Sequence, residues 1–353
     1  MVHLIKERGT HMSKEMNRRE FLKASAVTGV LFLAGDLLHG DPIVYGAVNI
    51  PGAEKITVTI ITDNYYETHT PSSKIANRFT GGLYAEHGLA CLIEPVVEGR
   101  SHPFLFDYGP TFPGVIRNMD ALKISFEKLE ALGLSHGHED HWGGLVELLK
   151  SRREKITKGI PLYVGEETFA ERFRKRPDGV RKGPQLKKED IADLGFVKIV
   201  EIKDSTPIVS GAYLTGRIEK VTDYEKVDPG RLVKRGGNLE PEDFIGEQSV
   251  VLNLKGKGLI VLSGCAHVGI VNTVKHAQRI TGIEKVHAIM GGFHLAGAKA
   301  DVIQRTVADI KAMAPDYIMP MHCTGFETMV AFAKEMPDQF ILNTAGTKYT
   351  FAS

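Results

Sequence analysis

Apolar and polar positions divide the chain into short apolar runs separated by amphipathic stretches of helical length. Runs rich in β-branched residues at 55–62, 89–97 and 104–107 predict strands, and a helix at 145–150 and a strand at 161–164 follow them. The second half repeats the theme, with predicted strands at 249–254, 259–262, 285–290, 317–319 and 339–343 and predicted helices at 269–281, 299–313 and 326–335. Strands that alternate with helices in two halves predict an α/β fold in which helices cover the sheets.

The stretch between the halves, 150–247, is longer than a connection in a compact domain needs. We interpret it as an insertion or a region that faces substrate. Residues 150–188 hold thirteen Lys or Arg against five Asp or Glu. A solvated helical face is the ordinary explanation. The functional alternative is an electropositive rim, with Arg172, Arg174 and Arg176, that attracts an anionic substrate. Residues 236–238, Gly-Gly-Asn, predict a turn, and no Walker-type phosphate loop is present.

The N-terminal segment predicts export. Residues 17–23 read Asn-Arg-Arg-Glu-Phe-Leu-Lys and closely resemble the twin-arginine motif, and the apolar stretch at 24–38 is too short to span a membrane. Small residues at 44–47 offer a cleavage site. The alternative, an amphipathic first helix, lacks an apolar stripe at helical spacing. We therefore expect 1–46 to be an extension read by the twin-arginine machinery, 47–353 to be the exported domain, periplasmic or otherwise extracytoplasmic, and no stable membrane anchor. Met16 directly precedes the motif, so 1–15 are left out of the fold prediction.

Composition is that of an ordinary folded enzyme, with 42% hydrophobic and 25% charged residues. A net charge of +1 excludes a global basic footprint, so we expect no nucleic-acid partner. The three cysteines, Cys91, Cys265 and Cys323, are an odd number and make no disulfide framework. Cys265 and Cys323 stand close to histidines in the sequence, so a bridge or a soft ligand pair remains open beside the alternative of buried inert thiols.

Four metal-capable side chains lie within six positions: His136, His138, Asp140 and His141. Imidazole nitrogen and carboxylate oxygen are ligands that zinc prefers. Glycines before and after the cluster predict a loop that exposes it and then opens into the helix at 145–150. A solvated histidine-rich loop is the alternative, but such tracts rarely interleave His and Asp so regularly. The sequence therefore predicts a metal site on this loop.

His-x-His-x-Asp-His followed by Gly-Gly resembles the signature of the metallo-β-lactamase-fold superfamily. Residues 104–109, Phe-Leu-Phe-Asp-Tyr-Gly, resemble its short apolar strand that ends in Asp and Gly. Three later segments, 263–269, 291–295 and 320–325, each carry a histidine and are similar to one branch, the proteins like dihydropterin–ribofuranosylaminobenzene phosphate synthases. The resemblance covers about residues 55–350. It implies a four-layer αβ/βα sandwich with metals where the edge loops of the two sheets meet.

The resemblance implies two metal ions. We expect His136, His138 and His267 to hold the first, and Asp140, His141 and His322 to hold the second. The Gly-Cys-Ala-His segment stands where many superfamily hydrolases place an Asp, so the third and bridging ligands stay open between His267 and Cys265. A Cys265 thiolate would need a lowered pKa, which a nearby metal supplies.

The other candidates have supporting or catalytic roles. Asp140 is also expected to orient the attacking water, and His294 to act as a group on the substrate side or as a support for a ligand. Asp107 is expected to hydrogen-bond a ligand histidine. The remaining histidines lack partners at motif spacing and are expected at the surface or satisfied in the core: His3, His11, His39, His69, His87, His102, His276 and His287.

These residues predict a hydrolase that uses zinc, with about two ions, while iron and manganese stay open. The related flavodiiron branch has Glu where this chain has His138, which favours zinc and hydrolysis over oxygen chemistry. The predicted substrate is a small anionic ester, a phosphoester in preference to a β-lactam. Two alternatives remain: a transferase like the dihydropterin phosphate synthases, and a non-catalytic exported protein that binds a metal or ligand and lacks an open cleft.

Overall fold

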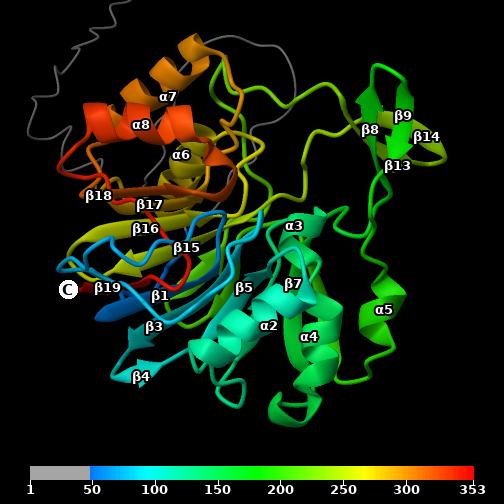
Figure 1. Cartoon of the computed structure of the whole chain (residues 1–353), viewed down its shortest axis with the longest axis horizontal. Coiled ribbons are helices and arrows are strands. Elements are labelled where there is room, and N and C mark those ends of the chain that lie inside the picture. The colour runs from blue at the N-terminus through cyan, green and yellow to red at the C-terminus, as the bar shows by residue number, and fades with distance from the viewer. Residues whose placement is uncertain (1–47) are drawn as a thin grey trace, which may run out of the picture. The chain divides into compact units, whose positions relative to one another are not determined.

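Two apolar sheets face each other at the centre of the computed structural model, which describes residues 48–353 (Figure 1). The twin-arginine motif, the apolar stretch and the cleavage region predicted at 17–47 lie outside the described residues. Within the described part of the chain, no helix is long and apolar enough to cross a bilayer.

The first sheet has nine strands: β1 (Lys55–Thr62), β2 (Ala76–Asn77), β3 (Ala90–Val97), β4 (Arg100–Ser101), β5 (Phe104–Tyr108), β6 (Ala131–Gly133), β7 (Ile160–Gly165), β10 (Val197–Ile202) and β19 (Lys348–Ala352). Their order is β10-β7-β6-β5-β3-β1-β19-β2, with β4 paired to β3. The four strands from β10 to β5 are parallel, and the pairs from β5 onward are antiparallel.

The second sheet has six strands: β11 (Thr206–Val209), β12 (Ala212–Leu214), β15 (Ser249–Leu254), β16 (Gly258–Ser263), β17 (Val286–Gly292) and β18 (Tyr317–Met321). They follow one another in this order across the sheet. The strands β16, β17 and β18 are parallel, and each is almost entirely buried, as expected for strands covered on both faces.

Seven α-helices and two 3-10 turns accompany the sheets in the described residues: α2 (Phe112–Ala121), α3 (Glu139–Trp142), α4 (Leu145–Ser151), η1 (Arg153–Lys155), α5 (Lys188–Ala192), α6 (Ile270–Thr281), α7 (Ala300–Ala312), η2 (His322–Thr324) and α8 (Phe326–Glu335). Local sequence sets some of their ends. Thr111 caps α2 by accepting from the Gly114 N–H, and Gly282 ends α6 at a positive φ of 67°.

Three clusters of buried apolar side chains hold the helices and sheets together. Between the sheets, Ile56, Ile93 and Phe106 of the first sheet are buried in one cluster with Leu252 and Ile260 of the second. A second cluster packs helices α2, α4 and α5 on the outer face of the first sheet, and a third packs α6, α7 and α8 on the outer face of the second. The layers therefore run helix, sheet, sheet, helix, which confirms the predicted four-layer αβ/βα sandwich (Figure 1).

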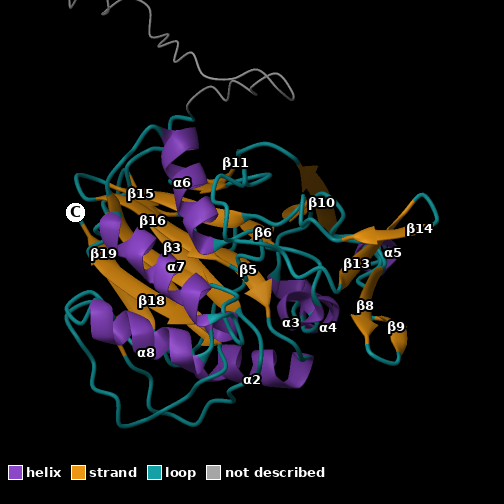
Figure 2. Cartoon of the chain, turned by 90° about the horizontal axis from the view of Figure 1, so that it is seen from above, coloured by secondary structure: helices purple, strands orange, loops and turns teal. Residues whose placement is uncertain are grey.

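A small antiparallel sheet stands apart from the two large ones. Its strands are β8 (Arg172–Arg176), β9 (Gly179–Lys182), β13 (Arg231–Arg235) and β14 (Asn238–Pro241), in the order β14-β13-β8-β9. The predicted turn joins β13 to β14, with Gly236 and Gly237 both at positive φ. Figure 2 shows this sheet projecting from the body of the sandwich beside α3. Only part of the stretch 150–247 is therefore outside the sandwich, because β7, β10, β11 and β12 belong to the large sheets.

Most predicted elements are confirmed within one or two residues, but the strand predicted at 339–343 is wrong. Only one bridge, between Ile318 and Phe340, forms there. Beyond it, the Leu342 carbonyl accepts from the Arg78 guanidinium, and the Asn343 amide donates to Asp63. These side-chain partners replace a strand ladder.

Candidate metal centre

The loops that carry the predicted site residues meet at one edge of the sandwich. Parallel strands place their carboxyl ends at the same edge of a sheet, and loops at that edge are the usual place for a binding site. The residues come from five strands or their following loops: Asp107 in β5, residues 135–141 after β6, Cys265 and His267 after β16, His294 after β17, and His322 after β18.

The motif loop is only partly exposed: His138 and Asp140 reach the cavity, but the prediction that the loop exposes the whole cluster is wrong for His136 and His141. His136 is 2% exposed and His141 is fully buried. The glycines instead permit close approach. A Cβ at Gly137 would lie 2.2 Å from the Thr168 carbonyl oxygen, and one at Gly143 would lie 2.0 Å from that of Pro110. The absent side chains let neighbouring loops close over the histidines.

Three imidazoles form what we call the first ligand group: His136, His138 and His267. The Nε2 atom of His267 lies 3.2 Å from His136 Nε2 and 3.1 Å from His138 Nδ1. Nitrogens that bind a tetrahedral zinc ion at about 2.1 Å are about 3.4 Å from one another. The spacing therefore suits three ligands of one ion.

The protonation of this group also suits a metal. Burial lowers the pKa of His136 and His267 well below the ordinary value and that of His138 to about 4. The rings are therefore neutral at pH 7, which is the form that binds metal. Acceptors for the outer ring protons are present: Ser135 Oγ lies 2.9 Å from His136 Nδ1, and Glu242 Oε2 lies 3.5 Å from His138 Nε2. The other ring nitrogens, His136 Nε2 and His138 Nδ1, are then unprotonated, and their lone pairs point toward His267 Nε2.

Asp140, His141 and His322 form the second ligand group. His141 Nε2 lies 3.2 Å from His322 Nε2, and Asp140 Oδ2 lies 3.4 Å from the same His322 atom. Burial acts to raise the pKa of Asp140, but its interactions with His141 and His322 outweigh burial and lower that pKa. This group offers one carboxylate oxygen and two imidazole nitrogens, a donor set that suits zinc and other transition metals.

Cys265 lies between the two groups. Its Sγ atom is 3.1 Å from His141 Nε2 and 3.3 Å from His322 Nε2, and it also lies within 4.8 Å of the donor atoms of His136 and His267. The two candidates that the sequence left open are thus both present, with His267 in the first group and Cys265 in the bridging position. Burial raises the pKa of the Cys265 thiol, so a bound cation is what would make it a thiolate.

The expected hydrogen bond between Asp107 and a histidine of the motif is present. Asp107 Oδ2 lies 2.6 Å from His141 Nδ1, and Asp107 also accepts from the N–H and hydroxyl of Ser135. Burial acts to lower the pKa of His141, but the carboxylates of Asp107 and Asp140 outweigh it and raise that pKa to about 9. Without a metal, His141 is therefore protonated at pH 7.

The loop after β1 fixes His322. Its backbone N–H donates to Asp63 Oδ1 at 2.8 Å, and its ring Nδ1 lies 3.3 Å from Asn64 Oδ1. The Asn64 amide also donates to the His322 carbonyl. His322 has a positive φ of 52°, and these contacts hold it in that conformation.

His294 belongs to neither ligand group. Its ring centroid lies 3.9 Å from that of His267, and it lines the same cavity. Its Nδ1 atom is buried and has no hydrogen-bond partner among the described residues. Its remaining metal-capable neighbours are the sulfurs of Cys265 and Cys323. This is a position from which it can contact a ligand in the cavity.

The structure adds two residues that sequence reasoning missed. His87, expected at the surface or in the core, lies with Nε2 3.7 Å from Asp140 Oδ2 and lines the cavity. Glu242 holds His138, as described above. Neither stands at motif spacing, and only the folded chain brings them to the site. The expectation for His102 and His287 is confirmed, since each pairs with a carboxylate away from the site, Glu130 and Asp316.

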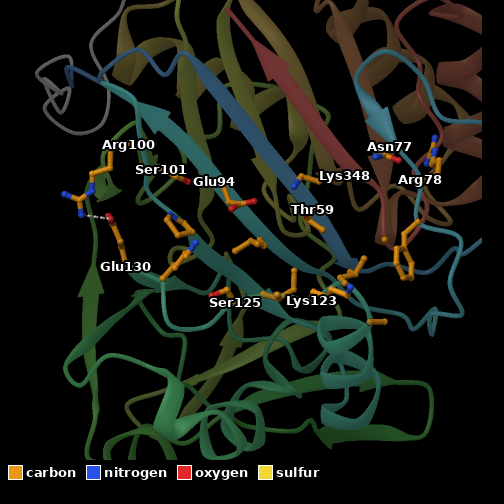
Figure 3. Close-up of a pocket in the computed structure, with 18 residues that line it drawn as sticks. Thr59, Asn77, Arg78, Glu94, Arg100, Ser101, Lys123, Ser125, Glu130 and Lys348 are labelled. Carbon is orange, nitrogen blue, oxygen red and sulfur yellow. Dashed lines mark hydrogen bonds and ion pairs between the residues drawn. The ribbon is translucent and has the colours of Figure 1, made fainter.

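A cavity of about 720 Å³ opens onto both ligand groups. A larger one, of about 850 Å³, lies elsewhere on the first sheet, where Thr59, Glu94 and Lys348 project from neighbouring strands (Figure 3). Neither His nor Cys lines that larger cavity, so it lacks the imidazole and thiolate ligands of the motif site. The smaller cavity is therefore the candidate active site, because metal-capable side chains line it.

Comparisons with known proteins agree with this geometry. The chain is 31% identical over 297 residues to the 7,8-dihydropterin-6-methyl-4-(β-D-ribofuranosyl)-aminobenzene-5'-phosphate synthase of Methanocaldococcus jannaschii, with 83% of this chain and 96% of that protein covered. An uncharacterized protein of the same organism is 28% identical over 257 residues, which are 71% of this chain and 89% of that protein. No protein-family model matches the chain.

Among solved structures, a metal-dependent hydrolase of the β-lactamase superfamily superposes with a TM-score of 0.67 at 22% identity, over 84% of this chain and 100% of that one. This likeness shows the fold. The sequence match to the synthase shows more than the fold, because its identity and coverage are high enough to show the family. Together they show that the chain has the metallo-β-lactamase fold and belongs to the family of the dihydropterin–ribofuranosylaminobenzene phosphate synthase.

Proposed function

We propose that this protein is a metal-dependent hydrolase of a small anionic ester, with a phosphoester as the favoured substrate and two zinc ions as the favoured metals. The observation that carries the proposal is the pair of ligand groups on either side of Cys265, at the floor of an open cavity. Similarity to a metal-dependent hydrolase supports the same class. Iron and manganese would also suit imidazole and carboxylate ligands.

A pair of bound divalent ions supplies Lewis acidity and a water-derived nucleophile at neutral pH. The chain's own residues do the rest. Asp140 has its carboxylate 24% exposed beside the cavity, so it can accept a proton from water and orient it. His294 lines the cavity, so its imidazole can contact substrate there. Glu242 and Asp107 hold His138 and His141 in place.

Two alternatives make different predictions. The family relationship favours a transferase like the synthase of Methanocaldococcus jannaschii. A non-catalytic metal-binding protein would keep the histidines and lack an open cleft, and the cavity of about 720 Å³ argues against it. A screen of the purified chain against phosphomonoesters, phosphodiesters, neutral esters and a β-lactam, with metal analysis, separates these functions. Metal-dependent release of phosphate is the result expected. Faster hydrolysis of neutral esters would contradict the phosphoester assignment.

We expect the Asp140→Asn variant to lose turnover and keep its fold. The amide cannot accept the proton of an attacking water, and general-base contributions are about a hundredfold or more. We therefore expect kcat on the best phosphoester to fall about a hundredfold, with an unchanged thermal midpoint and at least one metal retained. Glu147→Gln, at an exposed position of α4 outside the cavity lining, is the matched control and should keep its kcat. Full activity of Asp140→Asn would remove Asp140 from the mechanism.

Export by the twin-arginine route is a second part of the proposal, supported by residues 17–38 alone. Changing Arg18 and Arg19 together to Lys keeps the charge and removes the pair that the export receptor reads. We expect the folded variant to stay in the cytoplasm while the unchanged chain reaches the periplasm, as measured by cell fractionation. Lys6→Arg, outside the motif, should be exported normally. Normal export of the double variant would show that this segment is not such a signal.

A further inference from the structure

The small sheet presents a row of arginines to the metal-site cavity. In the strand register, Arg231 of β13 lies opposite Arg174 of β8, and Arg174 lies opposite Arg181 of β9. We call these three the arginine ladder. Residues paired across antiparallel strands project from the same face, and all three line the cavity together with the ligand-group residues His138 and His267. Arg176, two residues along β8, lines it as well.

Such a row has an energetic cost. Like charges directly opposite one another destabilise a strand pair. Asp228 pairs with Arg174 at 2.7 Å, and Asp178 pairs with Arg181. No carboxylate lies within 4.0 Å of the Arg231 or Arg176 guanidinium among the described residues. These two guanidinium groups therefore have no direct carboxylate partner at the cavity wall, although the charge of Asp228 also acts on Arg231.

The buried Nε atom of the Arg231 guanidinium has no hydrogen-bond acceptor among the described residues. Its Nη1 atom lies 3.4 Å from His138 Nε2. If His138 binds metal through Nδ1, its Nε2 carries the proton and points to Glu242, so it offers Arg231 no lone pair. A guanidinium with five donors in this setting is complementary to an anion.

Arg172 shows the contrast. Its Nε donates to Glu242 at 2.6 Å, and its other nitrogens donate to the carbonyls of Glu167, Thr168 and Ala170. It therefore holds the loop that carries Glu242 and is not free for substrate. Arg172 lines the cavity with Arg174 and Arg176, so it adds to the charge of the expected electropositive rim. Its neutralisation would also disturb Glu242 and, through it, the metal ligand His138.

We propose that the arginine ladder and Arg176 bind a second phosphate group of the substrate, one that does not react at the metal centre. The substrate would then be a small molecule with two phosphate groups or a diphosphate. The cavity of about 720 Å³ is within the usual range for small-molecule sites, and one wall carries the arginines while the floor carries both ligand groups. The position of the reacting group at the metals rests on the proposed function, but the anion site on the ladder does not.

Inorganic diphosphate, titrated calorimetrically into the metal-loaded full chain, tests this site. We expect Arg176→Gln to weaken diphosphate binding at least about tenfold, because charge-assisted hydrogen bonds from a fork are lost. Arg176→Lys should lie between, because it keeps the charge and loses the fork. The matched control is Arg305→Gln. Arg305 lies on α7, away from the cavity, and pairs with Asp223, so this variant removes an equal charge and should leave diphosphate binding unchanged.

Metal content, measured in every variant, separates the ladder from the metals. Equal diphosphate affinity in Arg176→Gln and Arg305→Gln at full metal content would place the anion on the metals alone and overturn the proposal. Arg231→Gln is a second variant, and weaker binding at unchanged metal content supports the ladder. Tighter binding of a single-stranded oligonucleotide than of diphosphate would overturn the small-ligand assignment. If no phosphoester is hydrolysed but Arg176→Gln still loses diphosphate, the hydrolase proposal fails and the anion site stands.

Discussion

His138→Ala is expected to lose one of about two bound metal ions and to lower kcat/KM at least about a thousandfold. The variant removes one of three nitrogens that face a common point, and it leaves Glu242 without its histidine partner. A metal ion stabilises transition-state charge by several kcal/mol, and each 1.4 kcal/mol is about tenfold in rate. The measurements are metal analysis of the purified protein and steady-state kinetics on the best phosphoester.

His287→Ala is the matched control for that loss. Like His138, this histidine is mostly buried and lies beside a carboxylate, with Nδ1 2.6 Å from Asp316 Oδ2. It stands near the start of β17, at the opposite end of that strand from the His294 loop. We expect it to keep its metal and its kcat/KM even if its stability falls. Unchanged metal content in His138→Ala, or equal metal loss in His287→Ala, would reject the first ligand group.

The layered fold was predictable because its elements carry strong local patterns. β1 and α8 have the bounds that the sequence predicts, since a run of eight residues rich in β-branched side chains and an amphipathic stretch of ten are each complete within the element. The small sheet was not predicted. Its strands carry charged residues on both faces, and β8 reads Arg-Phe-Arg-Lys-Arg, so no buried face gives it an apolar alternation. Its pairing depends on β13, which comes 55 residues later in the chain.

The residues of the candidate site also fall into those that the sequence predicted and those that only the fold reveals. Histidines of the motif and of the three later segments were found because a known pattern holds them at fixed spacing. Glu242, His87 and Arg231 have no such spacing, and each reaches the cavity only through the fold. The choice between His267 and Cys265 was open for a physical reason. Both lie on one loop two residues apart, and the structure shows that this loop is short enough to present both side chains to the ligand groups.

The two ligand groups are expected to take up metal with different pH dependence. A metal ligand must be unprotonated, so binding competes with any proton on the ligand. His138, with a pKa of about 4, and its partners in the first group are neutral above about pH 6. His141, with a pKa of about 9, carries a proton throughout the neutral range in the metal-free protein. Metal binding at the second group must therefore release that proton.

Competition between metal and proton sets the direction in which metal affinity changes with pH. Affinity at the second group should rise about tenfold per pH unit up to about pH 9, hence about a thousandfold from pH 6 to 9, while affinity at the first group stays nearly constant. Calorimetric titration of chelator-treated protein with zinc, in buffers of different ionisation enthalpy, counts the protons. At pH 7 we expect no proton from the histidines of the tighter step and one proton, from His141, for the weaker step, with a further proton released where Cys265 binds as the thiolate. Asp107→Asn keeps an oxygen for the Ser135 N–H and removes the larger of the two charges that favour protonated His141, so it should reduce the release, while the Asp140 charge remains. Two steps with equal proton release in the unchanged chain would mean that Asp107 does not hold His141 protonated before metal binds.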